Sequence, residues 1–286
     1  MQKKYLKSIF WILPLCLYSV DANAWGLFTH VYFAQSLLGA LPLLDNRFRN
    51  AIKNFPELVM AGACLPDLAV ISKKFKTTHQ WQKAEYLISV ADTEEEMAIA
   101  IGYASHLYVD VIAHNHFVPA HEAMWLNDSI FTHIGSEWAM DGHIAHKISH
   151  TPSQLLLKHT DVIMHFIAPC FGHHHTVVKR SLKRLAYADG LLRMVCLPKI
   201  INRWVQSMRN NKYQHFDYYI AKTEHALQEF HKVLSGHRPS WEPELDSRDV
   251  GHMLTWRVRC LEELIDDHAM PIHYYNGHKA KYILEH

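Results

Sequence analysis

The chain has 286 residues, with 29 Lys and Arg against 28 Asp and Glu, so its formal net charge is +1 when His is neutral. Residues 1–24 hold three of the basic and one of the acidic residues, which leaves 26 against 27 in the remaining 262 residues. This balance argues against a protein that binds nucleic acid mainly through a strongly basic surface. The length suffices for one large or two small domains.

The first 24 residues have the three parts of a secretory leader. Lysines come first, an apolar stretch follows at 9–20, and positions 22–24 read Ala-Asn-Ala. No stretch here or later is as long and uncharged as the roughly 20 residues that cross a bilayer. Lipoprotein processing requires a small residue before Cys16, where this chain has Leu. We therefore predict an exported protein, secreted or periplasmic, whose mature chain 25–286 begins at Trp25.

Apolar residues recur at helical spacing along most of the chain, whereas the alternation typical of strands is scarce. The predicted helices cover residues 31–44, 46–63, 93–116, 129–150, 153–167, 176–193, 199–209, 214–234 and 249–267. No Gly/Ser-rich or Pro-rich linker precedes the C-terminal helices. We therefore predict an all-α fold, a single multi-helix bundle domain over residues 25–286.

The predicted helix 93–116 should be long and buried. Thr93 is a typical N-cap, three Glu residues occupy the first turn, and the apolar run 97–111 is nearly continuous. A helix that is apolar on all sides is buried.

The chain has 24 His, so spacing must decide which of them have a function. His106, Asp110 and His114 follow one another at steps of four residues and share one face of the predicted helix 93–116. A buried carboxylate is costly unless it is paired or bound to metal, and no Lys or Arg occurs between Lys83 and Lys147. The three residues therefore form either part of a metal site or a hydrogen-bonded His-Asp-His network.

His133 and Glu137 repeat the four-residue step on another predicted helix. Two such helices that face each other are a known way to build a polynuclear metal site. Asp67 and His79 lie on connectors, where Asp is more often a turn or cap residue and His a surface residue. Their interpretation depends on the complete pattern.

That pattern resembles the zinc-dependent phospholipase C family, whose relatives include glycosylphosphatidylinositol-specific phospholipase D and the S1/P1 single-strand nucleases. The resemblance runs from Trp25 to about Trp138. Its motifs are an amino-terminal Trp exposed by processing, a nearby His, Gly-x3-Pro-Asp, a following His, His-x3-Asp and His-x3-Glu. Here they are Trp25, His30, Gly62 to Asp67, His79, His106 to Asp110, and His133 to Glu137.

The resemblance implies an all-α fold with three zinc ions. The implied ligands are His79, His106 and Asp110 with Asp67 beside them for one ion, the amino and carbonyl groups of Trp25 with His30 and a bridging Asp110 for the second, and His133, Glu137 and a further His for the third. Imidazole, carboxylate and amine ligands without thiolates suit zinc.

The further His is either His114 or His116. Bacillus-type phospholipases place it six residues after the Asp that corresponds to Asp110, which gives His116, and the phospholipase D relative places it four residues after, which gives His114. Helical geometry favours His114, because it shares a face with Asp110 and no Pro intervenes.

The resemblance implies a secreted metallophospholipase C that hydrolyses the glycerol–phosphate bond of phospholipids by a zinc-activated hydroxide. The products are diacylglycerol and a phosphorylated head group, and the partner is a phospholipid at a membrane or micelle surface. Asp67 is the candidate catalytic residue that orients or deprotonates the attacking water. Its other interpretation is as a metal ligand alone.

Two alternatives use the same residues: an S1/P1-type single-strand nuclease, and a helical protein in which zinc is only structural. A ligand set that spans five segments counts against the structural role. The last metal carboxylate is Glu137, as in phospholipases, where the nucleases have Asp, and this favours lipid. Leu68 and Lys76 stand where the choline-selective Bacillus enzymes have aromatic residues, so their choline box is not expected.

The region after about residue 150 carries no assignable chemistry. Lys179, Arg180, Lys183 and Arg184 lie at helical spacing, as a solvated face or as a contact with an anionic membrane. The mature cysteines are either buried thiols or up to two disulfides in any of three pairings. They are Cys64, Cys170, Cys196 and Cys260.

Overall fold

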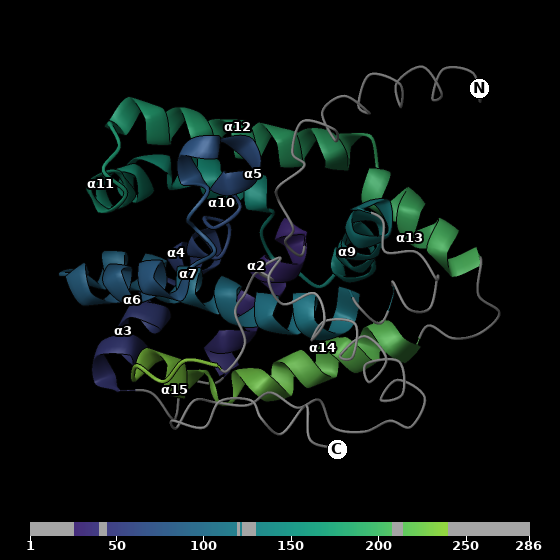
Figure 1. Cartoon of the computed structure of the whole chain (residues 1–286), viewed down its shortest axis with the longest axis horizontal. Coiled ribbons are helices and arrows are strands. Elements are labelled where there is room, and N and C mark those ends of the chain that lie inside the picture. Colours follow the sequence, from purple (N-terminus) through teal and green to yellow (C-terminus); the bar gives the residue numbers. More distant parts are fainter. Residues whose placement is uncertain (1–25, 40–44, 119–120, 122–129, 208–213, 240–286) are drawn as a thin grey trace.

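The structure is a computed structural model that describes residues 26–39, 45–118, 121, 130–207 and 214–239. These residues form helices and connectors, without a β-strand among them (Figure 1). The all-α prediction is confirmed. The leader, Trp25 and the predicted helix 249–267 lie outside the described residues.

The main helices, in chain order, are α2 Leu27–Ser36, α3 Asn46–Asn54, α4 Pro56–Gly62, α5 Leu68–Ile71, α6 Trp81–Val90, α7 Glu94–Ile112, α9 Ile130–Ile144, α10 Pro152–Lys158, α11 Thr160–Cys170, α12 His175–Met194, α13 Leu197–Ser207, α14 Gln214–Leu227 and α15 Phe230–Leu234. Short turns of tighter or wider helix are η1 Leu37–Gly39, η3 Lys73–Phe75 and η4 Ala113–Phe117.

Helix α7 is buried, as predicted, and it is the central helix of the fold. The side chain of Thr93 accepts a hydrogen bond from the Glu96 backbone N–H, and the Glu96 carboxylate accepts one from the Thr93 N–H, which completes a capping box. Every residue from Met97 to Ile112 is buried. Helices α2, α3, α4, α6, α11 and α15 all pack against it. The chain then continues into the π-helical turn η4.

Three predicted helices, 46–63, 153–167 and 214–234, are each two helices in the structure. The first break falls at Phe55, because Pro56 starts α4 and a residue that precedes Pro is disfavoured in helical conformation. The other two breaks contain no Pro, so the sequence gives no comparable signal. The prediction that each of these three segments forms one continuous helix was therefore wrong.

Helix α6 was absent from the predicted helices. It buries only Trp81, Ala84 and Leu87, a stripe too short to stand out from its polar neighbours. Helix α2 begins at Leu27, four residues before the predicted start, and ends at Ser36. Its first turn is held by a residue distant in sequence, which is described below.

Helices α4 and α7 touch through their backbones at two glycines. A Cβ added at Gly102 would lie 2.0 Å from the Val59 carbonyl oxygen, and one added at Gly62 would lie 2.3 Å from the Ile99 carbonyl oxygen. Only glycine fits at these two positions. This close approach brings the connector that follows α4 against the middle of α7.

Helices from the second half of the chain pack around α4 and α7 and against one another. Helix α9 packs against α13, and α12 packs against α10, α11 and α5. In Figure 1, α12 lies along the upper side of the molecule and α14 and α15 along the lower side. Cys64, Cys170 and Cys196 are free thiols, and Cys260 lies outside the described residues. In the described part of the chain, no helix combines the length and apolar character that a membrane crossing requires.

The contact between α4 and α7 predicts a large effect of Gly102→Ala. The new methyl group would meet backbone that cannot move alone, so the free energy of unfolding should fall by at least about 2 kcal/mol. Gly135→Ala is the matched control, because a Cβ there meets nothing within 4 Å and α9 should gain roughly 0.5–1 kcal/mol. Urea denaturation of both variants measures this. Equal stability of the two would contradict the proposed contact.

Candidate metal centre

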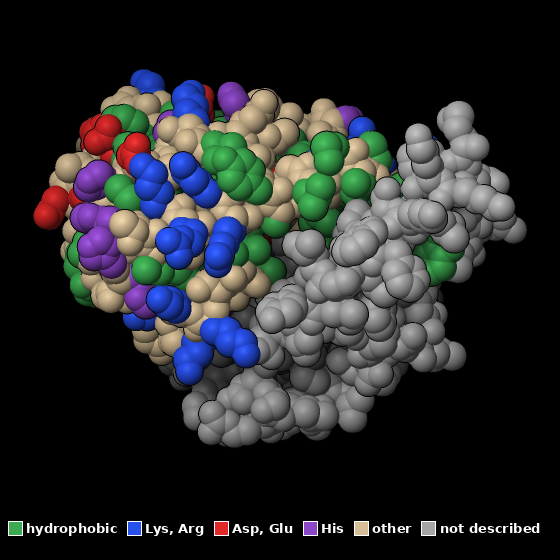
Figure 2. Space-filling view, turned by 90° about the horizontal axis from the view of Figure 1, so that it is seen from above, with side chains coloured by type: hydrophobic (Ala, Val, Ile, Leu, Met, Phe, Trp, Pro, Cys, Tyr) green, Lys and Arg blue, Asp and Glu red, His purple; other side chains and the backbone are tan. Residues whose placement is uncertain are grey.

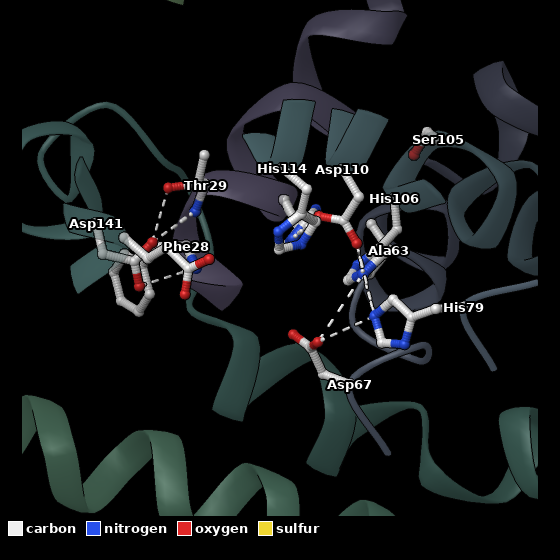
Figure 3. A network of polar contacts seen from close by, with 12 residues as sticks. Phe28, Thr29, Ala63, Asp67, His79, Ser105, His106, Asp110, His114 and Asp141 are labelled. Carbon is white, nitrogen blue, oxygen red and sulfur yellow. Dashed lines mark hydrogen bonds and ion pairs between the residues drawn. The ribbon is translucent and has the colours of Figure 1, made fainter. Parts of the chain in front are cut away.

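Ligand-type side chains from five segments meet in the interior. Figure 3 labels Asp67, His79, His106, Asp110 and His114 among them. In each of three groups of such side chains, one ligand atom per residue lies within 4.8 Å of the others. The groups are His30 with His106 and Asp110, Asp67 with His79 and His106, and His114 with His133 and Glu137. All of these side chains are buried except His133, which is partly buried.

Asp110 belongs to the first group and also faces the imidazoles of the second. Its Oδ1 is 3.2 Å from Nε2 of His30, and its Oδ2 is 2.9 Å from Nε2 of His106 and 3.5 Å from Nε2 of His79. The carboxylate is fully buried, and within the described residues all its ion-pair partners are His. Its two oxygens therefore face different imidazoles, as a carboxylate that bridges two cations would.

The protonation of His106 is set by the backbone. Its Nδ1 lies 2.7 Å from the Ala63 carbonyl oxygen, which can only accept, so Nδ1 carries the hydrogen. In the neutral ring, Nε2 then directs a lone pair at Asp110 Oδ2 and at His79 Nε2, which is 3.2 Å away. Metal-binding His side chains are commonly oriented by such a hydrogen bond on the other nitrogen. Electron-rich atoms that converge in this way require a cation among them.

Several buried polar atoms have no hydrogen-bond partner in the described structure. They include both carboxylate oxygens of Asp110, Oδ1 of Asp67, Nε2 of His114 and Oε1 of Glu137. Each such atom costs roughly 1–3 kcal/mol if it stays unsatisfied. The five atoms named here belong to residues of the three groups, where metal coordination would satisfy them.

The third group places His114, rather than His116, beside the α9 pair. His133 Nε2 is 2.9 Å from Glu137 Oε1, and the rings of His114 and His133 are 5.2 Å apart between centroids. His116 is also buried but belongs to none of the three groups. Although the backbone widens into η4 at Ala113, His114 stays on the face of Asp110, with Nε2 3.9 Å from Oδ1. The geometry favours the alternative that helical spacing favoured.

Burial sets the charge states in the centre. It lowers the pKa of both His79 and His114 to about 3, so these rings are neutral at pH 7, the form that binds metal. It raises the pKa of Glu137 to about 7 and that of Asp67 well above its usual range. Burial alone would also raise the pKa of Asp110, but two neighbouring imidazoles hold it well below its usual range.

The structure brings together eight of the nine predicted site residues: His30, Asp67, His79, His106, Asp110, His114, His133 and Glu137. The ninth, Trp25, lies outside the described residues, next to Gly26, from which the chain enters α2.

Sequence reasoning missed Asp141, which holds the first turn of α2. The Asp141 carboxylate accepts hydrogen bonds from the backbone N–H of Thr29 at 2.9 Å and from its hydroxyl at 2.8 Å, and from the N–H of Phe28 at 3.4 Å. The N-cap, Gly26, makes no side-chain capping bond, and a Cβ there would collide with Asp141. Because 112 residues separate Thr29 from Asp141, no local pattern predicts this contact.

Arg193 completes this contact from α12. Its guanidinium donates to Asp141 and to Asp189, and it lies 3.5 Å from the centroid of the Phe28 ring. The partly buried guanidinium therefore ties α9 and α12 to the start of α2. This arrangement orients the helix that carries His30 toward Asp110.

A comparison with protein-family models agrees with this centre. A model described as zinc dependent phospholipase C matches residues 29–267, well over half of the chain. The chain belongs to the zinc dependent phospholipase C family. No curated protein and no solved structure matches the chain.

The residues fit the metal of this family. The three groups contain imidazole nitrogens and carboxylate oxygens without a thiolate, and their unsatisfied atoms converge as ligands do. As a member of this family, the chain is a hydrolase with a zinc-dependent site.

Asp110→Asn should lower the zinc content most, because this carboxylate faces the imidazoles of two groups at once. We expect at least one zinc ion less per chain by elemental analysis of the purified protein. Asp161→Asn is the control, since Asp161 is exposed on α11 and pairs only with Lys179 among the described residues. Full zinc content in Asp110→Asn would contradict the bridging position.

Asp141→Asn should destabilise the protein by about 3 kcal/mol, because it leaves a partly buried guanidinium without its closest carboxylate and removes the charged acceptor of the first turn of α2. Asp189→Asn should cost less than half as much, since burial already raises the pKa of Asp189 to about 6 and α2 is untouched. Chemical denaturation of both variants measures the difference. Equal losses would show that Asp141 has no special part in holding α2.

Proposed function

We propose that the protein is an exported zinc phospholipase C that hydrolyses the glycerol–phosphate bond of phospholipids. The products are diacylglycerol and a phosphorylated head group. The observation that carries this proposal is the buried Asp110 carboxylate between two groups of imidazoles, in a chain of the zinc dependent phospholipase C family. Export is proposed from residues 1–24 alone.

The proposed ligands follow the three groups. His79, His106 and Asp110 would hold one zinc ion with Asp67 beside it, His30 with the amino and carbonyl groups of Trp25 a second, and His114, His133 and Glu137 a third. Asp110 would bridge the first two. Three ions are supported because the three groups share a single residue, His106, which belongs to two of them.

Zinc in this centre would lower the pKa of coordinated water to about 7 and draw negative charge from the phosphoryl oxygens. The protein contributes position and charge. Asp110 stays anionic, and the hydrogen bond from His106 Nδ1 to the Ala63 carbonyl keeps Nε2 directed inward. These fixed groups need no rearrangement when the phosphodiester binds.

Asp67 is the proposed catalytic residue. Its Oδ1 lies 3.7 Å from His79 Nε2 and 3.9 Å from His106 Nε2, farther than the oxygens of Asp110 lie from these nitrogens. Burial raises its pKa well above the usual range, which makes it a better proton acceptor. Asp67 would accept a proton from the attacking water as the new oxygen–phosphorus bond forms. The bond from phosphorus to the glycerol oxygen breaks, and that oxygen receives a proton.

The test is head-group release by the protein processed to begin at Trp25. Mixed micelles of phosphatidylcholine and phosphatidylethanolamine should release phosphocholine or phosphoethanolamine, and a chelator should abolish the activity until zinc is restored. Asp67→Asn should lower kcat by roughly 10²-fold or more and keep its zinc if Asp67 transfers a proton. Loss of zinc in this variant would assign Asp67 the role of a metal ligand alone.

A zinc-loaded protein that releases no head group but cleaves single-stranded DNA or RNA to 5′-phosphorylated fragments would overturn the proposed substrate in favour of the nuclease alternative. Zinc-loaded protein without either activity would overturn the proposed enzyme.

A further inference from the structure

Helices α12 and α13 expose a surface that the metal centre does not use. Between Thr176 and Val205 the chain has seven Lys and Arg and a single acidic residue, Asp189, which is buried. Figure 2 looks down on the α12 side and shows Lys and Arg side chains gathered there with hydrophobic side chains beside them. Asp and Glu lie toward the edge of this view.

We call this surface the basic–apolar face and define it by two sets of exposed residues. The basic set is Arg180, Lys183, Arg184, Lys199 and Arg203. The apolar set is Tyr187, Met194, Ile200 and Trp204, which are 62%, 73%, 50% and 55% exposed.

Helical spacing puts these residues on the outer side of each helix. On α12, positions 180, 183, 184, 187 and 194 alternate with the buried positions 178, 181, 182, 185, 186 and 189. On α13, positions 199, 200, 203 and 204 face outward while Asn202 and Val205 are buried. Large exposed side chains of this kind are concentrated here, since four of the seven exposed large hydrophobic residues lie on these two helices.

The basic residues of this face are not neutralised within the described structure. None of the five has an ion pair there, whereas Lys179 on the side of α12 pairs with Asp161 and the partly buried Arg193 pairs with Asp141 and Asp189. The mature chain is almost neutral overall, so this positive charge is local. A partner with a negatively charged surface would match it.

The face borders the metal centre on its Asp67 side. Asp67 is the N-cap of α5, and α5 packs against α12. The next turn, η3, exposes Lys73 and Lys74, and the Lys74 carbonyl lies 3.0 Å from Nε2 of His173, just before α12. The connector between Asp67 and His79 therefore extends the positive charge toward the centre.

We propose that the basic–apolar face binds the surface of an anionic phospholipid membrane. Exposed Lys and Arg attract anionic head groups, and Trp, Tyr and aliphatic side chains on the same helix face enter the boundary between head groups and acyl chains. A nucleic acid would match the charge but not the aliphatic Met194 and Ile200. The choice of lipid over other anionic surfaces rests in part on the proposed phospholipase activity.

The experiment measures sedimentation of the processed, zinc-loaded protein with vesicles of phosphatidylcholine alone and of phosphatidylcholine with one quarter phosphatidylglycerol. The protein should bind the anionic vesicles at least about tenfold more tightly, and 0.5 M salt should weaken this binding, since charges on a surface are screened. Lys183→Glu/Arg184→Glu should lower the affinity by at least about tenfold, because each basic residue near such a surface contributes roughly a fivefold factor. Ile200→Ser/Trp204→Ser should lower it for both kinds of vesicle.

Lys53→Glu/Tyr86→Ser is the matched control, with one exposed basic and one exposed aromatic residue on α3 and α6, away from α12. It should bind as the parent does. All variants should keep hydrolysis of a monomeric short-chain phospholipid within about twofold of the parent, because none touches the metal centre. If the Lys183/Arg184 variant does not fold, Lys199→Glu/Arg203→Glu tests the same claim.

Equal binding of the parent to both kinds of vesicle, or unchanged binding of the charge variants, would overturn the proposal. The proposal would also be overturned if the parent protein did not bind vesicles and instead formed dimers with rising concentration, or bound single-stranded DNA, and the same variants abolished that association. The two proposals fail separately. Hydrolysis of monomeric lipid without vesicle binding refutes only the face, and vesicle binding without hydrolysis of any lipid refutes only the enzyme.

Discussion

A buried carboxylate whose ion-pair partners in the described part of the chain are all His is the constraint on which this structure depends. Asp110 lies in the last turn of α7, where every residue from Met97 to Ile112 is buried, and within the described residues it pairs only with His. A charge in such a place is expensive unless other charges or a metal compensate for it. The rings of His79 and His114, which burial keeps neutral, supply lone pairs instead of positive charge, and a cation from outside the chain would compensate the carboxylates of this centre. Membership of a zinc-dependent family explains where it comes from.

The surrounding helices are arranged so that each ligand reaches this carboxylate. Gly62 and Gly102 allow α4 and α7 to touch, which places the Ala63 carbonyl where it orients His106. Asp141 caps α2 from another helix and thereby directs His30 to the opposite oxygen of Asp110. These contacts do not bind metal, but each one restricts a ligand to a single orientation.

Much of this could be predicted from the sequence, because the signals are local. The four-residue steps in α7 and α9 follow from helical geometry, and the capping residues of α7 are adjacent to it in sequence. The contact of Asp141 with Thr29 could not be predicted, since it joins segments 112 residues apart. Two of the three helix breaks lack Pro, and the stripe of α6 is too short to distinguish. The partition of the ligands into groups needed either the family resemblance or the coordinates.

The most direct test of the central claim is anomalous X-ray diffraction from crystals of the processed protein at the zinc absorption edge. The account predicts strong anomalous peaks on both sides of the Asp110 carboxylate, one toward His30 and one toward His79 and His106, and a third between His114, His133 and Glu137. Absence of peaks beside Asp110 in a folded and active protein would contradict it, because the buried carboxylate would then be stable without a cation.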